Sequence, residues 1–196
     1  MLSRYKDSFE GVLRVLSSPF TRFNVNPNVL TLSGLVLALA YLLAVEVRAG
    51  PLVTVTLYAL SLLMDGVDGV VARSSGRNTR FGAFLDSTVD RLVDVIYLFS
   101  LYRLSVTGVE GLILAVTGSL LISYTRARAE GLGLSLAGVG LMERSERGIV
   151  ILFILVLSYY HLGIATALFY ILLSLIYITL IQRIVRTYQG LKGEEA

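Results

Sequence analysis

The chain has 196 residues, of which 55% are hydrophobic and only 16% are charged. Soluble domains average about 25% charged residues, so this composition indicates a protein embedded in lipid. Cysteine is absent and His161 is the one histidine, which excludes disulfides, thiolate metal sites and a zinc site. In a membrane protein, the net charge of +3 reflects topology and anionic headgroups, and no nucleic-acid partner is expected.

The first predicted element is an amphipathic helix over residues 5–23. Apolar side chains recur at helical spacing from Phe9 to Leu16, and charged side chains occupy the opposite face. Such a helix lies in the cytoplasmic interface of a membrane, although a short soluble cap fits the same pattern. Pro27 is unsuited to a helix interior, so it separates this helix from the first span.

Six apolar segments follow, each close to the roughly 20 residues that cross a bilayer. They are residues 29–47, 52–72, 82–102, 109–126, 147–163 and 164–183. The last two are separated by a short turn around His161. Lysine and arginine gather at one set of ends, with Arg48 and Arg103 on the other side. The positive-inside rule therefore places both termini in the cytoplasm of a multi-pass protein of the cell membrane.

The expected fold class is all-α: a polytopic membrane protein with six transmembrane helices plus an N-terminal interfacial amphipathic helix. The expected domains are the cytoplasmic interfacial helix (1–27), the six-helix transmembrane catalytic domain (28–188) and a frayed cytoplasmic tail (189–196).

Aspartates are concentrated between residues 65 and 94 of this otherwise apolar chain. Carboxylates inside a membrane are costly and are therefore functional candidates. Asp65 and Asp68 stand three residues apart, and Asp86 and Asp90 four apart, so each pair shares one helix face. Small residues on these faces, such as Gly69, allow close helix packing, which brings both pairs around one cavity.

Ligands that are all oxygen imply a hard cation, Mg²⁺ or Mn²⁺. Four carboxylates can hold two ions about 4 Å apart, an arrangement suited to phosphoryl displacement. The alternative is that these acids form structural salt bridges with nearby arginines, including Arg77 and Arg91. Asp94 is expected to pair with Arg91 and is left out of the site.

The segment DGVDGVVAR, residues 65–73, is followed after eight residues by GAFLDSTVD, residues 82–90. This resembles the signature of the CDP-alcohol phosphotransferase family, and all eight fixed positions are present. The resemblance covers the whole length, because that family also has six spans and an N-terminal interfacial helix. It implies a membrane enzyme that transfers a phosphoryl-alcohol group from a CDP-lipid to a second alcohol, with release of CMP.

The resemblance also implies roles for individual residues. Asp65, Asp68, Asp86 and Asp90 are similar to the metal-binding carboxylates, and Asp90 to the general base that deprotonates the acceptor. The residues expected to bind the CDP-lipid are Asn28, Val29, Leu30, Thr31, Gly69, Arg73 and Thr79. The family resemblance further implies a homodimer that contacts membrane lipids.

The acceptor alcohol is indicated by a set of arginines that could bind a phosphate group. They are Arg126, Arg128, Arg147 and Arg183. Membrane topology alone explains the same charges. SYTRARAEGLG, residues 123–133, and MERSERG, residues 142–148, resemble stretches of prokaryotic phosphatidylinositol-phosphate synthases and their archaeal ether-lipid counterparts. This resemblance implies inositol 1-phosphate as acceptor. Glycerol 3-phosphate, and hence a phosphatidylglycerol-phosphate synthase, is the close alternative.

Intramembrane carboxylates also occur in ion-coupled transporters, which form an alternative of another class. The acids here lie towards one end of their helices, and the sequence shows no internal repeat. Both features favour the enzyme.

Overall fold

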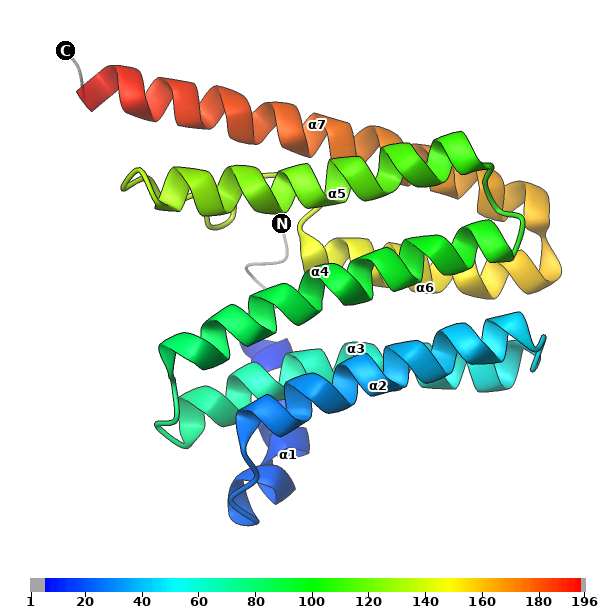
Figure 1. The fold of residues 1–196 in the computed structure, drawn as a ribbon, viewed down its shortest axis with the longest axis horizontal. Coiled ribbons are helices and arrows are strands. Elements are labelled where there is room, and N and C mark those ends of the chain that lie inside the picture. The colour runs from blue at the N-terminus through cyan, green and yellow to red at the C-terminus, as the bar shows by residue number, and fades with distance from the viewer. Residues whose placement is uncertain (1–5, 195–196) are drawn as a thin grey trace. The chain divides into compact units, whose positions relative to one another are not determined.

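The computed structural model describes residues 6–194, without the side chains of residues 6–10, 12, 14, 193 and 194. Every described element of regular structure is a helix, so the all-α prediction is confirmed (Figure 1). The helices are α1 (Lys6–Arg22), α2 (Pro27–Glu46), α3 (Pro51–Ser74), α4 (Arg80–Arg103), α5 (Val109–Glu130), α6 (Arg144–Tyr160) and α7 (Leu162–Glu194). Residues 1–5, where the predicted interfacial helix begins, and residues 195–196 lie outside the described residues.

The chain forms two compact units, Met1–Val93 and Asp94–Ala196, and α4 runs from one into the other. The first unit holds α1, α2, α3 and the acidic first half of α4. The second holds the rest of α4 with α5, α6 and α7.

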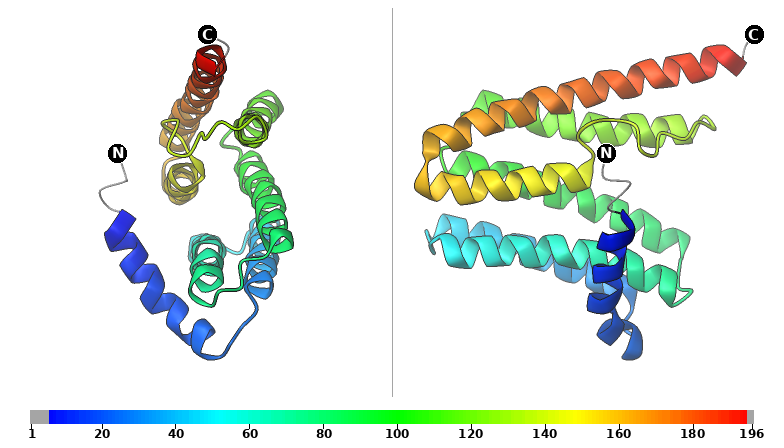
Figure 2. Two further views of the ribbon diagram at one scale, coloured as in Figure 1. Left: turned by 90° about the vertical axis from the view of Figure 1, so that its left-hand side faces the viewer. Right: turned by 180° about the vertical axis from the view of Figure 1, so that it is seen from behind.

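In the first unit, α2 and α3 form an antiparallel hairpin, seen side by side in Figures 1 and 2. Asn26 caps α2 by accepting a hydrogen bond from the Asn28 amide at 3.0 Å. The two helices approach closely at Gly34, where an added Cβ would lie 3.5 Å from the Cβ of Met64. At the same level the Ser61 hydroxyl donates to the Gly34 carbonyl at 2.7 Å. These contacts hold the turn of α3 that carries Asp65 against α2.

Helix α1 packs across α3 through its apolar face. The side chain of Leu13 lies over Gly66, where an added Cβ would be only 3.2 Å from its Cδ2 atom. Leu13 and Phe20 join the cluster formed by Leu30, Val67 and Val71. Residues 6–22 of the predicted element are helical, and an amphipathic helix in a membrane interface stays a prediction.

In the second unit, α5 lies along α7, and α6 forms a hairpin with α7 around His161 (Figure 2). Gly118 of α5 allows this close packing, because an added Cβ would lie 2.6 Å from the Cγ2 atom of Ile176. The α5–α6 connection is fastened to α7 by a hydrogen bond from the Met142 amide to Thr179 Oγ1 at 3.0 Å.

The C-terminal segment differs from its prediction. Residues 189–194 were expected to be frayed, but they continue α7. The reason is a contact with the α5–α6 connection: a Cβ added at Gly190 would lie 3.0 Å from both terminal methyl groups of Leu134.

Within the described part of the chain, three helical segments are long and apolar enough to cross a membrane: Pro27–Glu46, Pro51–Ser74 and Leu162–Lys192. The other predicted spans form helices that are shorter or more polar, as α4 is because of its aspartates. The structure therefore indicates a membrane protein, and six spans stay a prediction.

Candidate active site

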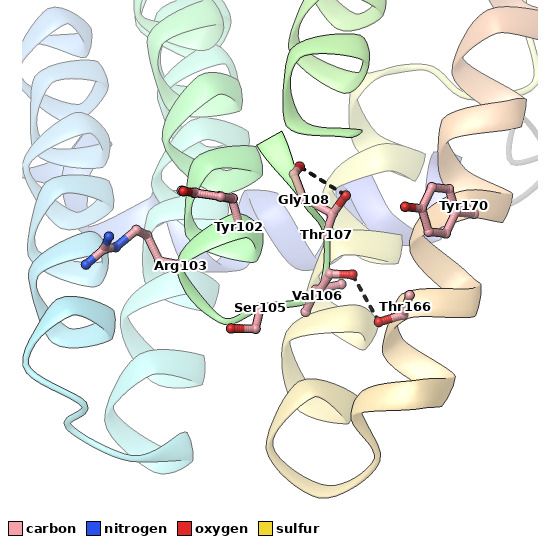
Figure 3. A pocket seen from close by; sticks show the side chains of 8 residues that line it. All are labelled: Tyr102, Arg103, Ser105, Val106, Thr107, Gly108, Thr166 and Tyr170. Atoms are coloured by element: carbon pink, nitrogen blue, oxygen red, sulfur yellow. Dashed lines mark hydrogen bonds between the residues drawn. The ribbon is translucent and has the colours of Figure 1, made fainter. Parts of the chain in front are cut away.

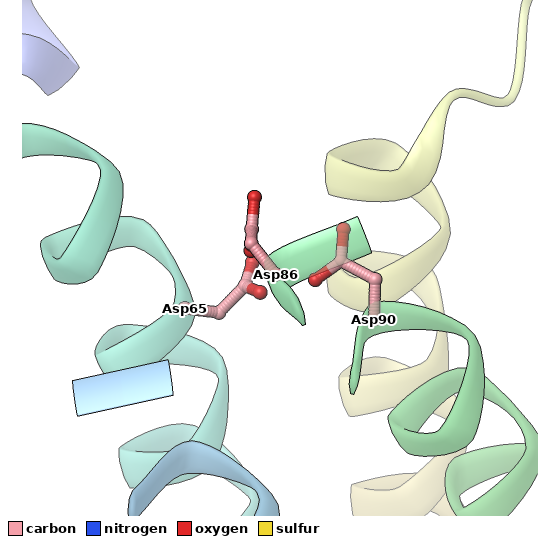
Figure 4. A group of neighbouring side chains, drawn as sticks. All are labelled: Asp65, Asp86 and Asp90. Atoms are coloured by element: carbon pink, nitrogen blue, oxygen red, sulfur yellow. The ribbon is translucent and has the colours of Figure 1, made fainter. Parts of the chain in front are cut away.

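Three of the predicted carboxylates meet in the first unit. Asp65 on α3 and Asp86 and Asp90 on α4 each offer one oxygen, and these oxygens lie within 4.8 Å of one another. Figure 4 shows the three side chains turned towards one another. All three are partly buried. The predicted meeting of acids from two helices is thus confirmed for these residues.

This arrangement fits a divalent cation. Three partly buried carboxylates at this separation repel one another unless a positive charge lies among them. Their donors are all oxygen, which suits a hard ion such as Mg²⁺ or Mn²⁺. The charge and the donor set of these three residues are therefore suited to holding a divalent metal ion.

Asp68 lies beside this cluster but is held towards α2. Its side chain is buried, and Oδ2 accepts a 2.6 Å hydrogen bond from the hydroxyl of Thr31. Asp65 and Asp68 line, together with Thr31 and Ser61, a cavity of about 10 Å³, which is about the room needed by one water molecule. Asp68 also interacts electrostatically with Asp86 and Asp65. Thr31 therefore orients a predicted metal ligand.

Thr31→Val should lower the free energy of unfolding by about 1–3 kcal/mol, because it leaves a buried carboxylate oxygen without this donor. Thr31→Ser keeps the hydroxyl and should restore most of that stability. Thr54→Val is a matched control, since the Thr54 hydroxyl bonds to backbone oxygens of its own helix turn at 3.0 and 3.2 Å. Thermal unfolding in detergent measures all three. Equal melting temperatures for Thr31→Val and the wild type would contradict this role.

The residues expected to bind the CDP-lipid divide into two groups in the structure. Asn28 and Thr79 meet at Gly82, where an added Cβ would lie 3.0 Å from an oxygen of each. Gly69 faces the guanidinium of Arg73, whose Nη1 would lie 3.4 Å from an added Cβ.

The α2 part of the predicted CDP-lipid wall is less uniform. Val29 is exposed, whereas Leu30 is buried in the apolar cluster with Val67 and Val71. Thr31 is engaged with Asp68. Of these three side chains, only Val29 is exposed for contact with a lipid.

The arginines near the acids are used in different ways. Arg77 donates to the Asn24 carbonyl and to its side-chain oxygen, both at 2.9 Å, and so fastens the α3–α4 connection to the α1–α2 connection. Arg91 donates to the Ser87 carbonyl at 2.6 Å, and its Nη1 lies 3.6 Å from Asp90 Oδ2. Both of these Arg77 hydrogen bonds go to Asn24 and not to one of the acids, so they are not part of a salt-bridge network.

The prediction that Asp94 pairs with Arg91 is wrong. Asp94 is buried in the second unit, where it pairs with Arg147 and lies 3.6 Å from Nε of Arg144. The reason is helix packing: α6 presents both arginines to α4, whereas Arg91 is engaged one turn back, at Ser87.

The predicted acceptor arginines also divide. Arg126 and Arg147 both lie within electrostatic range of Arg183. Arg183 is buried, and it donates to the carbonyls of Val139 at 3.0 Å and Ile122 at 2.7 Å. Arg126 is exposed and pairs with Glu130 at 2.8 Å. Arg128 stands two residues after Arg126 on α5 and so points to a different helix face.

A second hollow, of about 550 Å³, lies in the second unit at the α4–α5 connection (Figure 3). It is lined by residues of the stretch 102–108 together with Thr166 and Tyr170. Thr166 donates to the Val106 carbonyl at 3.0 Å, which fastens this connection to α7. None of the predicted site residues lines it.

Sequence reasoning missed the roles that three residues have in this geometry. Gly34 lies where α2 contacts α3, Thr31 holds Asp68, and Asp94 holds Arg147. For Asp94, the sequence offered one signal: its four-residue spacing from Asp90, which places it on the same helix face as Asp86 and Asp90.

Together, the fold and the site define a helical membrane protein with an acidic centre for a divalent cation and a neighbouring glycine–arginine pair. The sequence pattern of the CDP-alcohol phosphatidyltransferase family matches residues 24–189. The chain therefore belongs to this family and is a phosphotransferase of phospholipid biosynthesis. Membership of this enzyme family excludes the alternative that the protein is an ion-coupled transporter.

Similar proteins include two archaeal enzymes named archaetidylinositol phosphate synthase. The one from Aeropyrum pernix is 42% identical over 94% of this chain and 95% of its own length. The one from Methanothermobacter thermautotrophicus is 39% identical over 95% of both chains.

Among solved structures, the phosphatidylinositol phosphate synthase PgsA1 of Mycobacterium tuberculosis with CDP-DAG bound is 27% identical, with a TM-score of 0.77. The match covers 90% of this chain and 94% of that one. The same enzyme was also solved in complex with manganese and citrate.

Proposed function

We propose that this enzyme condenses a CDP-lipid, CDP-archaeol or CDP-diacylglycerol, with inositol 1-phosphate. The products are the inositol-phosphate phospholipid and CMP. The observation that carries the proposal is the 42% identity, over nearly the full length of both chains, to an archaetidylinositol phosphate synthase. The clustering of Arg126, Arg147 and Arg183 supports a phosphorylated acceptor, because a neutral alcohol would give these cations no anion to bind.

The cofactor in this proposal is Mg²⁺, as two ions held by Asp65, Asp68, Asp86 and Asp90, with Mn²⁺ as a substitute. The manganese in the M. tuberculosis relative supports a divalent ion. When bound, such ions supply positive charge that neutralises the pyrophosphate of the CDP-lipid.

The residues of the chain supply the remaining chemistry. Gly69 leaves room for the cytidine, and Arg73 binds a phosphate of the CDP group. Asp90 accepts the proton of the acceptor hydroxyl, whose oxygen forms a bond to the phosphorus attached to the lipid. The bond from that phosphorus to the oxygen of CMP breaks, and CMP leaves with the electron pair. No covalent enzyme intermediate is needed.

The membrane placement is also a proposal. Helices α2 to α7 would provide six spans with both termini and the active site in the cytoplasm, and α1 would lie in the interface. The shortest, α6, has 17 residues, or about 26 Å at 1.5 Å per residue, which is close to the hydrocarbon thickness. We propose a homodimer as the working assembly.

An acceptor screen tests the substrate assignment. Purified enzyme receives CDP-archaeol or CDP-diacylglycerol with inositol 1-phosphate, glycerol 3-phosphate, free inositol or serine, one at a time, and CMP release is measured. We expect kcat/KM for inositol 1-phosphate to exceed that for free inositol at least about tenfold, since a charged hydrogen bond contributes about 1.5–3 kcal/mol. Preference for glycerol 3-phosphate would show that the enzyme is instead a phosphatidylglycerol-phosphate synthase.

Arg126→Ala should raise the KM for inositol 1-phosphate about tenfold or more, for the same reason. The KM for the CDP-lipid should change much less, because in this proposal the CDP group is bound by Arg73 and not by Arg126. Arg186→Ala is the matched control: Arg186 is exposed on α7 and lies outside the predicted sites. If Arg126→Ala and Arg186→Ala had equal acceptor KM values, Arg126 would not bind the acceptor, and membrane topology alone would explain its charge.

A further inference from the structure

The buried carboxylate of Asp94 is surrounded by donors from two other helices of the second unit. The Arg147 Nη2 group donates to Oδ2, and the Ser119 hydroxyl lies 3.3 Å from the same oxygen. Nε of Arg144 lies 3.6 Å from Oδ1. Asp94 is only 6% exposed, so these partners offset the cost of burying its carboxylate.

Arg147 is the most enclosed cation of this group. Its side chain is 2% exposed, and only one edge of the guanidinium is used by Asp94. Nε and Nη1 are buried and have no hydrogen-bond partner among the described residues. Buried donors are nearly always satisfied, so two unsatisfied N–H groups on one buried guanidinium indicate a ligand that is absent from the structure.

The neighbouring arginines differ in this respect. Arg183 has Nε and Nη1 already bound to backbone carbonyls, and Arg126 is exposed and paired with Glu130. A buried guanidinium with free N–H donors is suited to charge-assisted hydrogen bonds with the oxygens of a phosphate. Arg147 is therefore the arginine best prepared to bind the anionic group of the acceptor.

We infer that Asp94 is a positioning residue for the acceptor: it fixes the Arg147 guanidinium so that the N–H donors left free by Asp94 can bind the acceptor phosphate. The inference rests on the proposed function, since it assigns the phosphate to the inositol phosphate. It also gives a role to the third of the three aspartates that stand four residues apart on α4. Asp86 and Asp90 serve the metal cluster, and Asp94, four residues further along the same helix, serves the arginine.

The test compares Asp94→Asn and Ser119→Ala with Glu110→Gln, an exposed acid-to-amide change at the start of α5. For each variant, KM is measured for inositol 1-phosphate and for the CDP-lipid, together with inhibition by inorganic phosphate. Asp94→Asn should raise the acceptor KM and the inhibition constant of phosphate about tenfold or more, and leave the CDP-lipid KM within about twofold. Ser119→Ala should move the same two constants by about threefold, and Glu110→Gln should move none.

These constants separate positioning from a purely structural ion pair. A structural role reduces the amount of folded enzyme, which lowers apparent kcat but leaves both KM values unchanged. If Asp94→Asn fails to fold, Ser119→Ala decides by the same constants. Wild-type acceptor KM in Ser119→Ala, and in Asp94→Asn where it folds, would overturn the inference.

The outcome for the wild type is independent of the variants. A wild-type enzyme that uses free inositol as well as inositol 1-phosphate, without inhibition by phosphate, refutes the proposed function. A wild type that prefers inositol 1-phosphate, with an Asp94→Asn variant of unchanged KM, refutes only the positioning role.

Discussion

Asp86→Asn should lower turnover by about 10²–10³-fold, a loss of the size seen when one essential electrostatic contact to the transition state is removed. An amide is a poor ligand for a hard cation, and Asp86 is one of three carboxylates whose oxygens lie within 4.8 Å of one another. Asp65→Asn should have the same effect. CMP release from the CDP-lipid at saturating Mg²⁺ measures the rate.

Binding of Mn²⁺, followed by electron paramagnetic resonance in the absence of substrates, gives a second readout. Both variants should bind Mn²⁺ more weakly, whereas the control Glu110→Gln should bind and turn over as the wild type does. Wild-type turnover and Mn²⁺ affinity in Asp86→Asn would show that the cluster is not the metal site.

Asp90→Asn should separate catalysis from binding. If Asp90 accepts the proton of the acceptor hydroxyl, kcat should fall about 10²–10⁴-fold, the usual contribution of a general base. The KM for the CDP-lipid should change less than in Asp65→Asn, because the proposed role of Asp65 is solely to hold the metal that neutralises the pyrophosphate. Steady-state kinetics of both variants at saturating acceptor measure the difference.

The side chain of Asp90 is 14% exposed and lies 3.6 Å from the Arg91 guanidinium. Arg91→Lys keeps a positive charge beside Asp90 but removes the guanidinium. It is therefore a control for changes in this neighbour that leave the Asp90 carboxylate in place. An Asp90→Asn enzyme that fails to bind the CDP-lipid, yet turns over what is bound at the wild-type rate, would disprove the base.

Much of the architecture follows from local sequence. The 3.6-residue period of a helix places Asp86 and Asp90 on one face whatever packs against it, so their pairing could be predicted. Pro27 and the His161 turn likewise marked real helix ends, because proline and turn residues act on the backbone locally. The end of α7 could not be predicted in this way, because Leu134 supports it from a distant segment.

The choice of partner for each buried acid was decided by tertiary packing. Asp68 bonds with Thr31, 37 residues away, and Asp94 with Arg147, 53 residues away. Local sequence offered Arg91 to Asp94, but the helix geometry of α4 turns Arg91 back to Ser87. Spacing alone identifies which residues share a helix face but not which face of another helix lies opposite.

The glycines show the same division. Gly69 was expected to bring the helices together, but its neighbour is the side chain of Arg73 on its own helix. Close approaches lie at Gly82, within the family signature, and also at Gly34 and Gly118, outside it. The sequence by itself determined the helical membrane class, the family and the acids that meet in the carboxylate cluster, because these depend on composition, period and motif. Only the tertiary structure decided that Thr31 holds Asp68 and that Asp94 holds Arg147, since a buried charge takes whichever partner the packed helices bring within hydrogen-bond distance.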